Sequence, residues 1–433
     1  MGRAAKTLQA AKFVGGIYLQ RALLIYAAKL RGDLFSRLIL NGGRTDPYEI
    51  YEQMRELGPM VRTRLGNYST TSHRVCNEVL RSRSFGVTPN DGSQDVAHEE
   101  LLDLSLLTLN PPDHSRIRRL AAPAFTPRRM AGYTTLIDKA IHKLLDRAEV
   151  QGQFDLMTGF ASPLPITVMT HLLGLPDEPE RFRRLGSTIA GALDGISSLG
   201  QARMLAAADA ELRHTFDELL ARRVTEPGDD LVSALVAEQG NKITAEELGP
   251  LVRLLLIAGF ETTVNAIGNG MRWLLADRQQ WELLVADPSR APAVAEEVLR
   301  FDPPVQQTAR VAHADIEVGG VGLKKNQWVI TMLAAAGRDP EVYPDPGRFD
   351  ITRESPVEHL AFSGGIHYCL GSPLARMELA QAFQALAERF PDIQQAGPIT
   401  MRRGATLRGP QHFPVDVRGG QADRRTIAQS RAT

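Results

Sequence analysis

Apolar residues at helical spacing cover most of the chain and predict a mainly helical protein. Between about residues 73 and 239, prolines break this pattern at Pro111-Pro112, Pro176 and Pro227-Gly228. A much longer helix is expected next, because Thr244 and Glu247 form a capping box. It would run without interruption from Thr244 to about Asp277, roughly 50 Å at 1.5 Å per residue. A helix of that length is expected to cross the core.

Short β-branched runs predict a small sheet section beside the helices. Residues 61–65 and 68–72 flank Gly66-Asn67 and predict a hairpin. Further strands are expected at 316–318, 328–332 and 413–417. Together these patterns favour one mainly α domain with a small β section.

The ends of the chain differ from its middle. Residues 1–45 are expected to form a helical extension, 46–418 the main domain, and 419–433 a disordered tail. The apolar runs Phe13–Gln20 and Ala22–Ala28 are shorter than the ~20 residues that span a bilayer. No small-residue cleavage site indicates a signal peptide. A basic amphipathic helix touching a membrane surface and a packed or solvated helix both remain open, so membrane contact is expected to be peripheral at most.

Composition narrows the class of protein. The 433 residues are 43% hydrophobic and 23% charged, which is ordinary for a globular protein. Lys plus Arg and Asp plus Glu number 50 each, so no global charge suggests a nucleic-acid partner. Two cysteines give no disulfide framework and favour the reducing cytoplasm.

The segment Phe362–Gly371 places Cys369 between glycines, just before an expected helix. At a helix N-terminus, free amides and the helix dipole favour a thiolate. Gly365 and Gly371 would let the backbone approach the sulfur closely. Such a thiolate can act as a nucleophile, a zinc ligand or the axial ligand of haem iron. Only His367 lies near enough in sequence to be a second zinc ligand, so zinc is disfavoured, whereas a catalytic Cys-His pair and a plain buried cysteine stay open.

The expected central helix has an unusual middle, Ala258–Thr263. Glycine and consecutive threonines weaken a helix, and the Thr262 hydroxyl can bond back to the carbonyl of Ala258. Glu261 and Thr262 could form a proton relay toward a reacting oxygen. The alternative is a solvent-facing Glu261 and a Thr262 satisfied by its own helix.

Two further pairs of residues share a helical face. Glu297 and Arg300 stand three apart, which is common for surface ion pairs of small energy. His114 and Arg118 stand four apart and could together bind a carboxylate or phosphate, or form a solvated basic face.

The order and spacing of these motifs resemble the cytochrome P450 monooxygenases, specifically the soluble bacterial kind, from about residue 46 to 417. The resemblance implies the single-domain P450 fold, with the long central helix over the haem. Its motifs are Phe362–Gly371, Ala258–Thr263, Glu297-Val298-Leu299-Arg300, Arg338-Asp339-Pro340 and Asp345-Pro346-Gly347-Arg348-Phe349-Asp350.

By this resemblance Cys369 is the metal ligand, the axial thiolate of haem b, whose electron donation favours O–O cleavage. Phe362 and Gly371 would lie beside the haem. The haem propionates would be held by His114, Arg118, Arg310 and His367. Glu297, Arg300 and Arg348 would form a buried network supporting the cysteine loop.

Glu261 and Thr262 are similar to the catalytic acid–alcohol pair of the family, which favours dioxygen over peroxide-driven chemistry. Two departures from the family pattern are Ser363, where glycine is usual, and Glu261, where aspartate is common. Neither is expected to touch the metal ligand.

The implied reaction inserts one oxygen atom into a C–H bond or a double bond. No flavin or iron–sulfur motif occurs, so electrons are expected from a ferredoxin and an NAD(P)H-driven ferredoxin reductase. A basic docking surface would consist of Arg116, Arg119, Arg128, Arg129 and Arg376. The protein is expected to be a cytoplasmic monomer. A cysteine-dependent hydrolase and a haem-binding sensor or lipid carrier are the alternatives.

The substrate pocket is expected to be lined by small and apolar segments, which favours a lipophilic small molecule: a terpenoid, a branched or fatty lipid, a steroid or a polyketide. These segments are Gly86–Leu102, Ile189–Met204, Ala258–Thr262, Val305–Ala309 and Thr406–Pro410.

Overall fold

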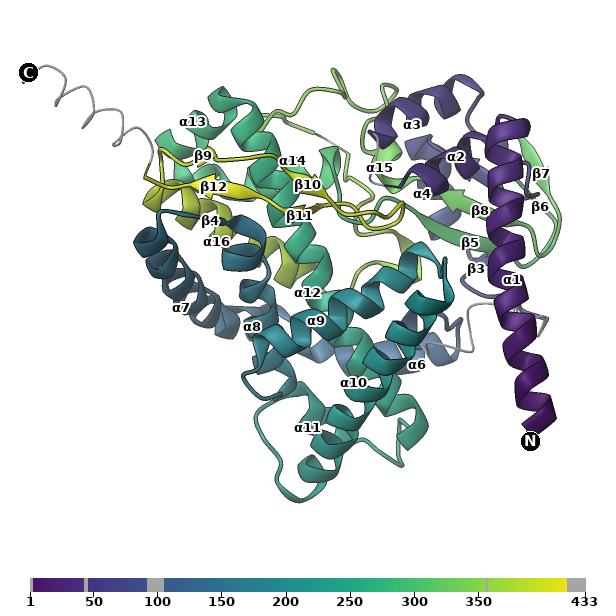
Figure 1. The fold of residues 1–433 in the computed structure, drawn as a ribbon, viewed down its shortest axis with the longest axis horizontal. Helices are drawn as coiled ribbons and strands as arrows, with labels where there is room; N and C mark the ends of the chain where they lie inside the picture. Colours follow the sequence, from purple (N-terminus) through teal and green to yellow (C-terminus); the bar gives the residue numbers. More distant parts are fainter. Residues whose placement is uncertain (1–2, 43–45, 92–104, 356, 419–433) are drawn as a thin grey trace, which may run out of the picture.

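A computed structural model describes residues 3–42, 46–91, 105–355 and 357–418, with side chains from residue 15 onward. Helices make up most of it, as predicted (Figure 1). They are α1 (Arg3–Leu30), α2 (Leu34–Asn41), α3 (Pro47–Glu56), α4 (His73–Arg81), α6 (Asp113–Ala121), α7 (Pro127–Gln151), α8 (Pro163–Leu173), α9 (Pro179–Ala190), α10 (Leu199–Thr225), α11 (Leu231–Val236), α12 (Ala245–Ala276), α13 (Arg278–Ala286), α14 (Ala291–Phe301), α15 (Leu333–Ala336) and α16 (Ser372–Arg389).

The predicted long helix is α12, and its start is set by the capping box. The Thr244 side chain accepts a hydrogen bond from the Glu247 amide, and the Glu247 carboxylate accepts one from the Thr244 amide, at 3.3 and 2.9 Å. Pro250 lies inside the helix without ending it, so α12 runs from Ala245 to Ala276 without interruption, as expected. Among the described helices α12 is long and apolar enough to span a membrane, but 83% of that stretch is buried inside the protein. It is therefore the core helix.

Short strands form separate small sheets. They are β1 (Val61–Arg62), β2 (Tyr68–Thr70), β3 (Phe85–Gly86), β4 (Gln153–Asp155), β5 (Thr308–Ala312), β6 (Ile316–Val318), β7 (Val321–Leu323), β8 (Trp328–Thr331), β9 (Gln394–Gln395), β10 (Thr400–Met401), β11 (Pro410–His412) and β12 (Pro414–Asp416). The largest has the order β1-β2-β8-β5-β3. The predicted hairpin is its β1–β2 pair, in which Val61 lies opposite Ser69, and β6, β8 and β12 confirm the other three predicted strands.

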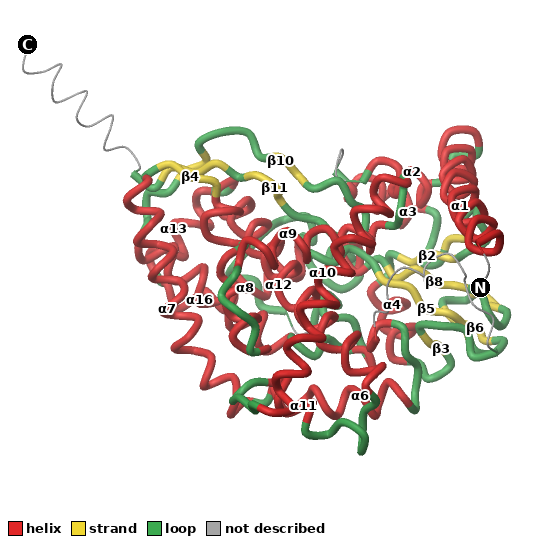
Figure 2. Tube along the Cα trace, turned by 60° about the horizontal axis from the view of Figure 1, so that its bottom comes forward, coloured by secondary structure: helices red, strands yellow, loops and turns green. Residues whose placement is uncertain are grey.

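The helices and the largest sheet occupy different parts of the molecule (Figure 2). In the helical part, α12 is surrounded by α8, α9, α10, α14 and α16, and their apolar side chains form the main core. The sheet lies at the other side with α3 and α4 (Figure 1). Helix α1 stands at the outer edge of this part and packs on α2. The predicted disordered tail 419–433 and most of the predicted loop 86–102 lie outside the described residues.

Candidate functional site

A tight backbone loop presents Cys369 just before α16. The Cys369 amide donates a hydrogen bond to the Phe362 carbonyl at 2.9 Å, which closes the loop. Gly371 caps α16, and the amides of Gly371 and Ser372 lie close enough to the cysteine sulfur to lower the pKa of its thiol. Phe362 is buried and packs in the main core. The structure thus places the sulfur at a helix N-terminus, as the sequence predicts.

The two glycines of this loop have different roles from the one expected. Gly365 has a φ of +63°, and a Cβ there would lie 2.4 Å from the carbonyl oxygen of Leu80, so glycine is required by α4. At Gly371 a Cβ would meet only Phe125, at an ordinary 3.9 Å. Neither glycine is explained by a close approach to the sulfur, which corrects that prediction.

The expectation that protein groups favour the thiolate form of Cys369 over its thiol is also wrong. The Cys369 side chain is accessible, yet protein atoms surround it closely enough for burial to raise the pKa of its thiol. The amides of Gly371 and Ser372, with Arg118 and Arg376 nearby, lower the pKa by less than burial raises it. A charged sulfur here therefore gains from a cationic partner such as a metal ion.

Four cationic or potentially cationic side chains gather on one side of the cysteine loop. The rings of His114, from α6, and His367 lie 4.2 Å apart between centroids. Arg118 donates to the carbonyl of Tyr368 at 2.6 Å. Arg310, from β5, donates to the Ser363 hydroxyl at 3.1 Å.

Burial and mutual repulsion lower the pKa values in this cluster. Burial and then the neighbouring cations lower the pKa of His114 to about 4 and that of His367 to about 3, and burial alone lowers that of Arg310 to about 10. Within the described residues no carboxylate forms an ion pair with Arg118 or Arg310, and His114 Nδ1 and His367 Nε2 are buried without hydrogen-bond partners. The cluster is therefore suited to an anionic group.

These residues fit a haem. The accessible sulfur, with two backbone amides nearby, would be a suitable ligand for a haem iron. The four side chains of the cluster, with two unpartnered buried nitrogens, suit a pair of carboxylates. All five of these side chains were expected from the sequence to bind the haem.

A catalytic Cys-His pair does not form. Among the described residues, no hydrogen bond joins His367 to Cys369, and the His367 ring instead packs on His114. Since burial raises the pKa of the thiol and lowers that of the imidazole, both groups favour their neutral forms. This arrangement disfavours the nucleophile hypothesis.

The middle of α12 holds a buried carboxylate beside a threonine. Glu261 forms an ion pair with Arg402 and accepts a hydrogen bond from the Ser187 hydroxyl of α9 at 3.0 Å. The Thr262 hydroxyl donates to the carbonyl of Ala258 at 2.9 Å, as predicted. Of the alternative, a solvent-facing glutamate is wrong, because Glu261 is only 2% exposed, whereas Thr262 is satisfied by its own helix as that alternative stated.

Several of the expected pocket segments meet beside this part of α12. Val305 and Leu407 form a β-bridge between two of them. Asp194, between α9 and α10, accepts hydrogen bonds from the amides of Thr406 and Leu407 at 2.6 and 3.4 Å. A Cβ on Gly409 would collide with Asn265 of α12, so this loop lies directly against the helix.

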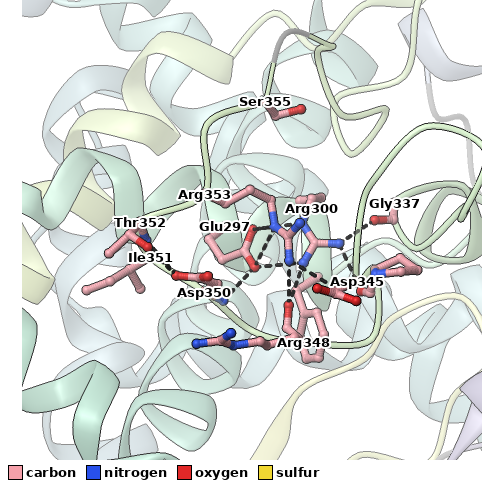
Figure 3. A network of polar contacts seen from close by, with 12 residues as sticks. Glu297, Arg300, Gly337, Asp345, Arg348, Asp350, Ile351, Thr352, Arg353 and Ser355 are labelled. Carbon is pink, nitrogen blue, oxygen red and sulfur yellow. Dashed lines mark hydrogen bonds and ion pairs between the residues drawn. The ribbon is translucent and has the colours of Figure 1, made fainter.

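The predicted α14 ion pair is buried and part of a larger network (Figure 3). Arg300 binds Glu297 through two hydrogen bonds of 2.7 Å, and both side chains are 4% exposed. Arg353 is the third charged member, with its Nε 3.4 Å from Glu297. Arg348, expected in that place, contributes its carbonyl oxygen while its side chain is exposed. The Asp350 amide donates a hydrogen bond to Glu297, and the backbone turn at Asp350 brings Arg353 back toward α14.

Helix α14 is joined to α16, the helix that follows Cys369, by the ion pair of Glu296 and Arg376, which was not predicted from the sequence. Arg376 of α16 binds Glu296 at 2.7 Å and lies 4.5 Å above the Phe362 ring. Burial raises the pKa of Glu296, but His359, 3.3 Å away, and the hydrogen bond from Arg376 outweigh this and lower it to about 2. Arg376 is thus engaged inside the protein.

The five arginines expected to form a docking surface therefore divide into two groups. Arg116 forms ion pairs with Glu247 and Asp113, and Arg129 forms one with Asp229, like Arg376 with Glu296. Arg119 and Arg128 are exposed and have no ion pair with a described residue. Only these two retain a fully available charge.

Comparison with known proteins gives consistent matches. A family model described as Cytochrome P450 matches residues 291–404. The putative cytochrome P450 140 of Mycobacterium tuberculosis is 40% identical over 412 residues, covering 89% of this chain and 93% of that protein. The 6-deoxyerythronolide B hydroxylase of Saccharopolyspora erythraea is 39% identical over 397 residues, covering 86% and 96%. The crystal structure of P450BioI in complex with hexadec-9Z-enoic acid ligated acyl carrier protein is similar with a TM-score of 0.80 and 33% identity, covering 86% of this chain and 98% of that one.

Proposed function

The chain belongs to the cytochrome P450 family of monooxygenases, and on this premise we propose that it inserts one atom of dioxygen into a lipophilic small molecule, by hydroxylation or epoxidation. The observation that carries the proposal is the accessible Cys369 sulfur, held by two helix N-terminal amides beside a cluster of cations without carboxylate partners among the described residues. The family implies a haem-iron cofactor, and haem b is the form proposed here.

Cys369 would ligate the iron of this haem through its sulfur. The haem iron, when bound, supplies the activation of dioxygen. Phe362 packs in the core next to the loop, and the amides of Gly371 and Ser372 lie near the sulfur and favour its charged form. Such amide donors to a ligating sulfur tune its electron donation.

His114, Arg118, Arg310 and His367 would bind the haem propionates. A pair of carboxylates would satisfy the two imidazole nitrogens that lack partners and would relieve the repulsion among the cations. Anion binding would raise the pKa values of both histidines toward their usual range.

Glu261 and Thr262 would supply protons to the reacting oxygen. Glu261 is buried, forms an ion pair with Arg402 and accepts a hydrogen bond from Ser187, so its carboxylate is held in the protein interior at the middle of α12. The Thr262 hydroxyl bonds to the Ala258 carbonyl, which fixes its orientation in α12. The pair favours dioxygen over peroxide as oxidant.

Support for a lipophilic substrate comes from the segments beside the middle of α12, where the apolar residues Val305 and Leu407 form a β-bridge and pack on the main core. Two related proteins are named for such molecules: one is the 6-deoxyerythronolide B hydroxylase, and the other is P450BioI, whose structure contains hexadec-9Z-enoic acid linked to acyl carrier protein. A terpenoid, a fatty or branched lipid, a steroid or a polyketide fits this environment.

Electrons would come from a ferredoxin and an NAD(P)H-driven ferredoxin reductase, with Arg119 and Arg128 as the available cations of the docking surface. Residues 46–418 would be the catalytic domain, and 1–45 and 419–433 would be additions to it. The protein would act as a monomer in the cytoplasm, without a nucleic-acid partner.

The carbon monoxide difference spectrum of the reduced protein tests the proposal. The wild-type protein should show the red-shifted Soret band from which the family takes its name. Cys369→Ala should lose that band, whereas Cys76→Ala, at the other and fully buried cysteine, should keep it. A Cys369→Ala protein that keeps the band would overturn the proposal.

A further inference from the structure

Helix α1 carries an apolar stripe on the face that points away from the protein. Leu19, Leu23, Tyr26 and Leu30 are 62%, 47%, 48% and 74% exposed. Their spacing of four, three and four residues places them on one side of the helix. The opposite side is the packed one, with Ile17, Ala27 and Ala28 buried. The stripe is therefore not covered by any residue that the structure describes.

The charge of this region is of one sign only. The first 32 residues contain no Asp or Glu, and the first acidic residue is Asp33. The basic residues in this stretch are Arg3, Lys6, Lys12, Arg21, Lys29 and Arg31. Because the whole chain has a formal net charge of zero, this is a local concentration of positive charge beside an exposed apolar stripe.

The position of α1 leaves this stripe free to meet a flat surface. The helix lies at the outer edge of the molecule and packs chiefly on α2 (Figure 1). Its Arg21 side chain donates to the carbonyl of Ser197 at 3.4 Å, in the loop between α9 and α10. This loop is flanked in sequence by the exposed apolar residues Leu193 and Met204.

We propose that α1 lies on the surface of a membrane with anionic headgroups, with its stripe in the boundary between headgroups and acyl chains. An interfacial helix of this kind combines exposed apolar residues with Lys and Arg that attract anionic lipid. A second copy of the chain is the less suitable occupant, because two stripes packed together would bring like charges close. The inference goes beyond the proposed function, which needs no membrane.

Vesicle flotation of the full-length holoprotein tests this inference. The protein should float with vesicles of equimolar phosphatidylcholine and phosphatidylglycerol, and far less with phosphatidylcholine alone. Binding should weaken as salt rises, since surface charge attraction is screened. Lys29→Gln should lower the partition coefficient roughly fivefold, the usual effect of one basic residue near an anionic surface.

Variants of the stripe separate this role from a structural one. Leu19→Ser combined with Leu23→Ser should lower the partition coefficient by roughly tenfold or more. The matched control Leu57→Ser, 63% exposed on another helix end, should change nothing. Tyr26→Trp should report a blue-shifted fluorescence on vesicle binding, in a helix that otherwise has no tryptophan.

The inference is overturned if the holoprotein does not float with anionic vesicles, or if the double stripe variant floats as well as the wild type. It is equally overturned if the stripe instead mediates a concentration-dependent dimer in sedimentation without vesicle binding. The carbon monoxide spectrum of each variant checks the haem site separately, so loss of membrane binding and failure of the proposed function are distinguishable.

Discussion

The guanidinium of Arg402 pairs with the carboxylate of Glu261 across 141 positions of sequence. The pair joins the segment after β10 to the middle of α12. With the Ser187 hydroxyl at 3.0 Å, it holds a buried acid in one orientation beside Thr262. The acid of the proposed relay is thus fixed by elements outside its own helix.

Removing the hydroxyl of Thr262 should uncouple electron use from product formation. In Thr262→Ala the product formed per NAD(P)H consumed should fall at least severalfold, because protons would no longer be delivered in an ordered way. Glu261→Gln should lower product formation between roughly ten- and a hundredfold. Both are measured by product and NAD(P)H assays with a substrate found by its effect on the iron spin state.

Thr188→Ala is the matched control for this prediction. Its hydroxyl makes the same bond to a carbonyl four residues back, at 2.8 Å in α9, and it is not part of the proposed relay. Equal coupling in Thr262→Ala and Thr188→Ala would refute the assigned role of Thr262.

Breaking the buried ion pair on α14 should destabilise the fold strongly. Glu297→Gln leaves Arg300 and Arg353 without their carboxylate, and such a loss inside a protein costs about 3–5 kcal/mol. Urea unfolding of each variant measures this change. Glu282→Gln, which removes an exposed partner of Arg278, should cost less than about 1 kcal/mol. Similar losses for the two variants would contradict the structural role.

A buried glutamate predicts pH-dependent stability. Glu378 of α16 is 1% exposed, and burial raises the pKa of its carboxyl to about 8, which the nearby Thr263 hydroxyl only partly offsets. Its ordinary pKa is near 4.5, so between these values the unfolded chain has lost the proton that the folded protein keeps. The contribution of Glu378 to the free energy of unfolding should therefore be most favourable below about pH 4.5. It should fall by a few kcal/mol in total as the pH rises toward 8.

Urea unfolding at several pH values between 5 and 9 measures this effect on the wild type and on Glu378→Gln. The variant keeps the shape of the side chain without a titratable group, so its stability should decline less with pH. A wild type and variant with the same pH dependence would show that the carboxyl is not held neutral.

Electron transfer from an acidic ferredoxin should depend on the two unpaired arginines. Arg119→Glu combined with Arg128→Glu should slow reduction of the haem severalfold at low salt, because attraction to the partner would be replaced by repulsion. Stopped-flow reduction measures the rate. Arg203→Glu on α10 is the control, since that helix packs on α9 and α12 and not on the cysteine loop. A wild-type rate that does not fall with salt would exclude electrostatic docking.

Local patterns were sufficient to predict the elements that carry the chemistry. The capping box at Thr244 located the start of α12, and the threonine pattern gave the bond from Thr262 to Ala258. The position of Cys369 before a helix was also predicted from adjacent residues. Each of these features depends on residues within about four positions, where sequence spacing determines geometry.

Contacts between distant segments could not be predicted in the same way. Arg402 reaches Glu261 from a turn with no periodic signal, and Arg353 takes the place expected for Arg348 because of a backbone turn. The raised pKa of the Cys369 thiol follows from the packing around it, which no local pattern encodes. Such contacts depend on how elements pack, and a single sequence gives little information about that.

The hydrogen bonds from Thr406 and Leu407 to Asp194 join the α9–α10 connection to the hairpin of β10 and β11. Lifting this connection away from α12 would either break both bonds or carry the hairpin with it. Because Arg402 of the same hairpin holds Glu261, a motion that carries the hairpin away would also release the acid of α12. Along that path, opening of the protein and readiness for chemistry would be mutually exclusive states.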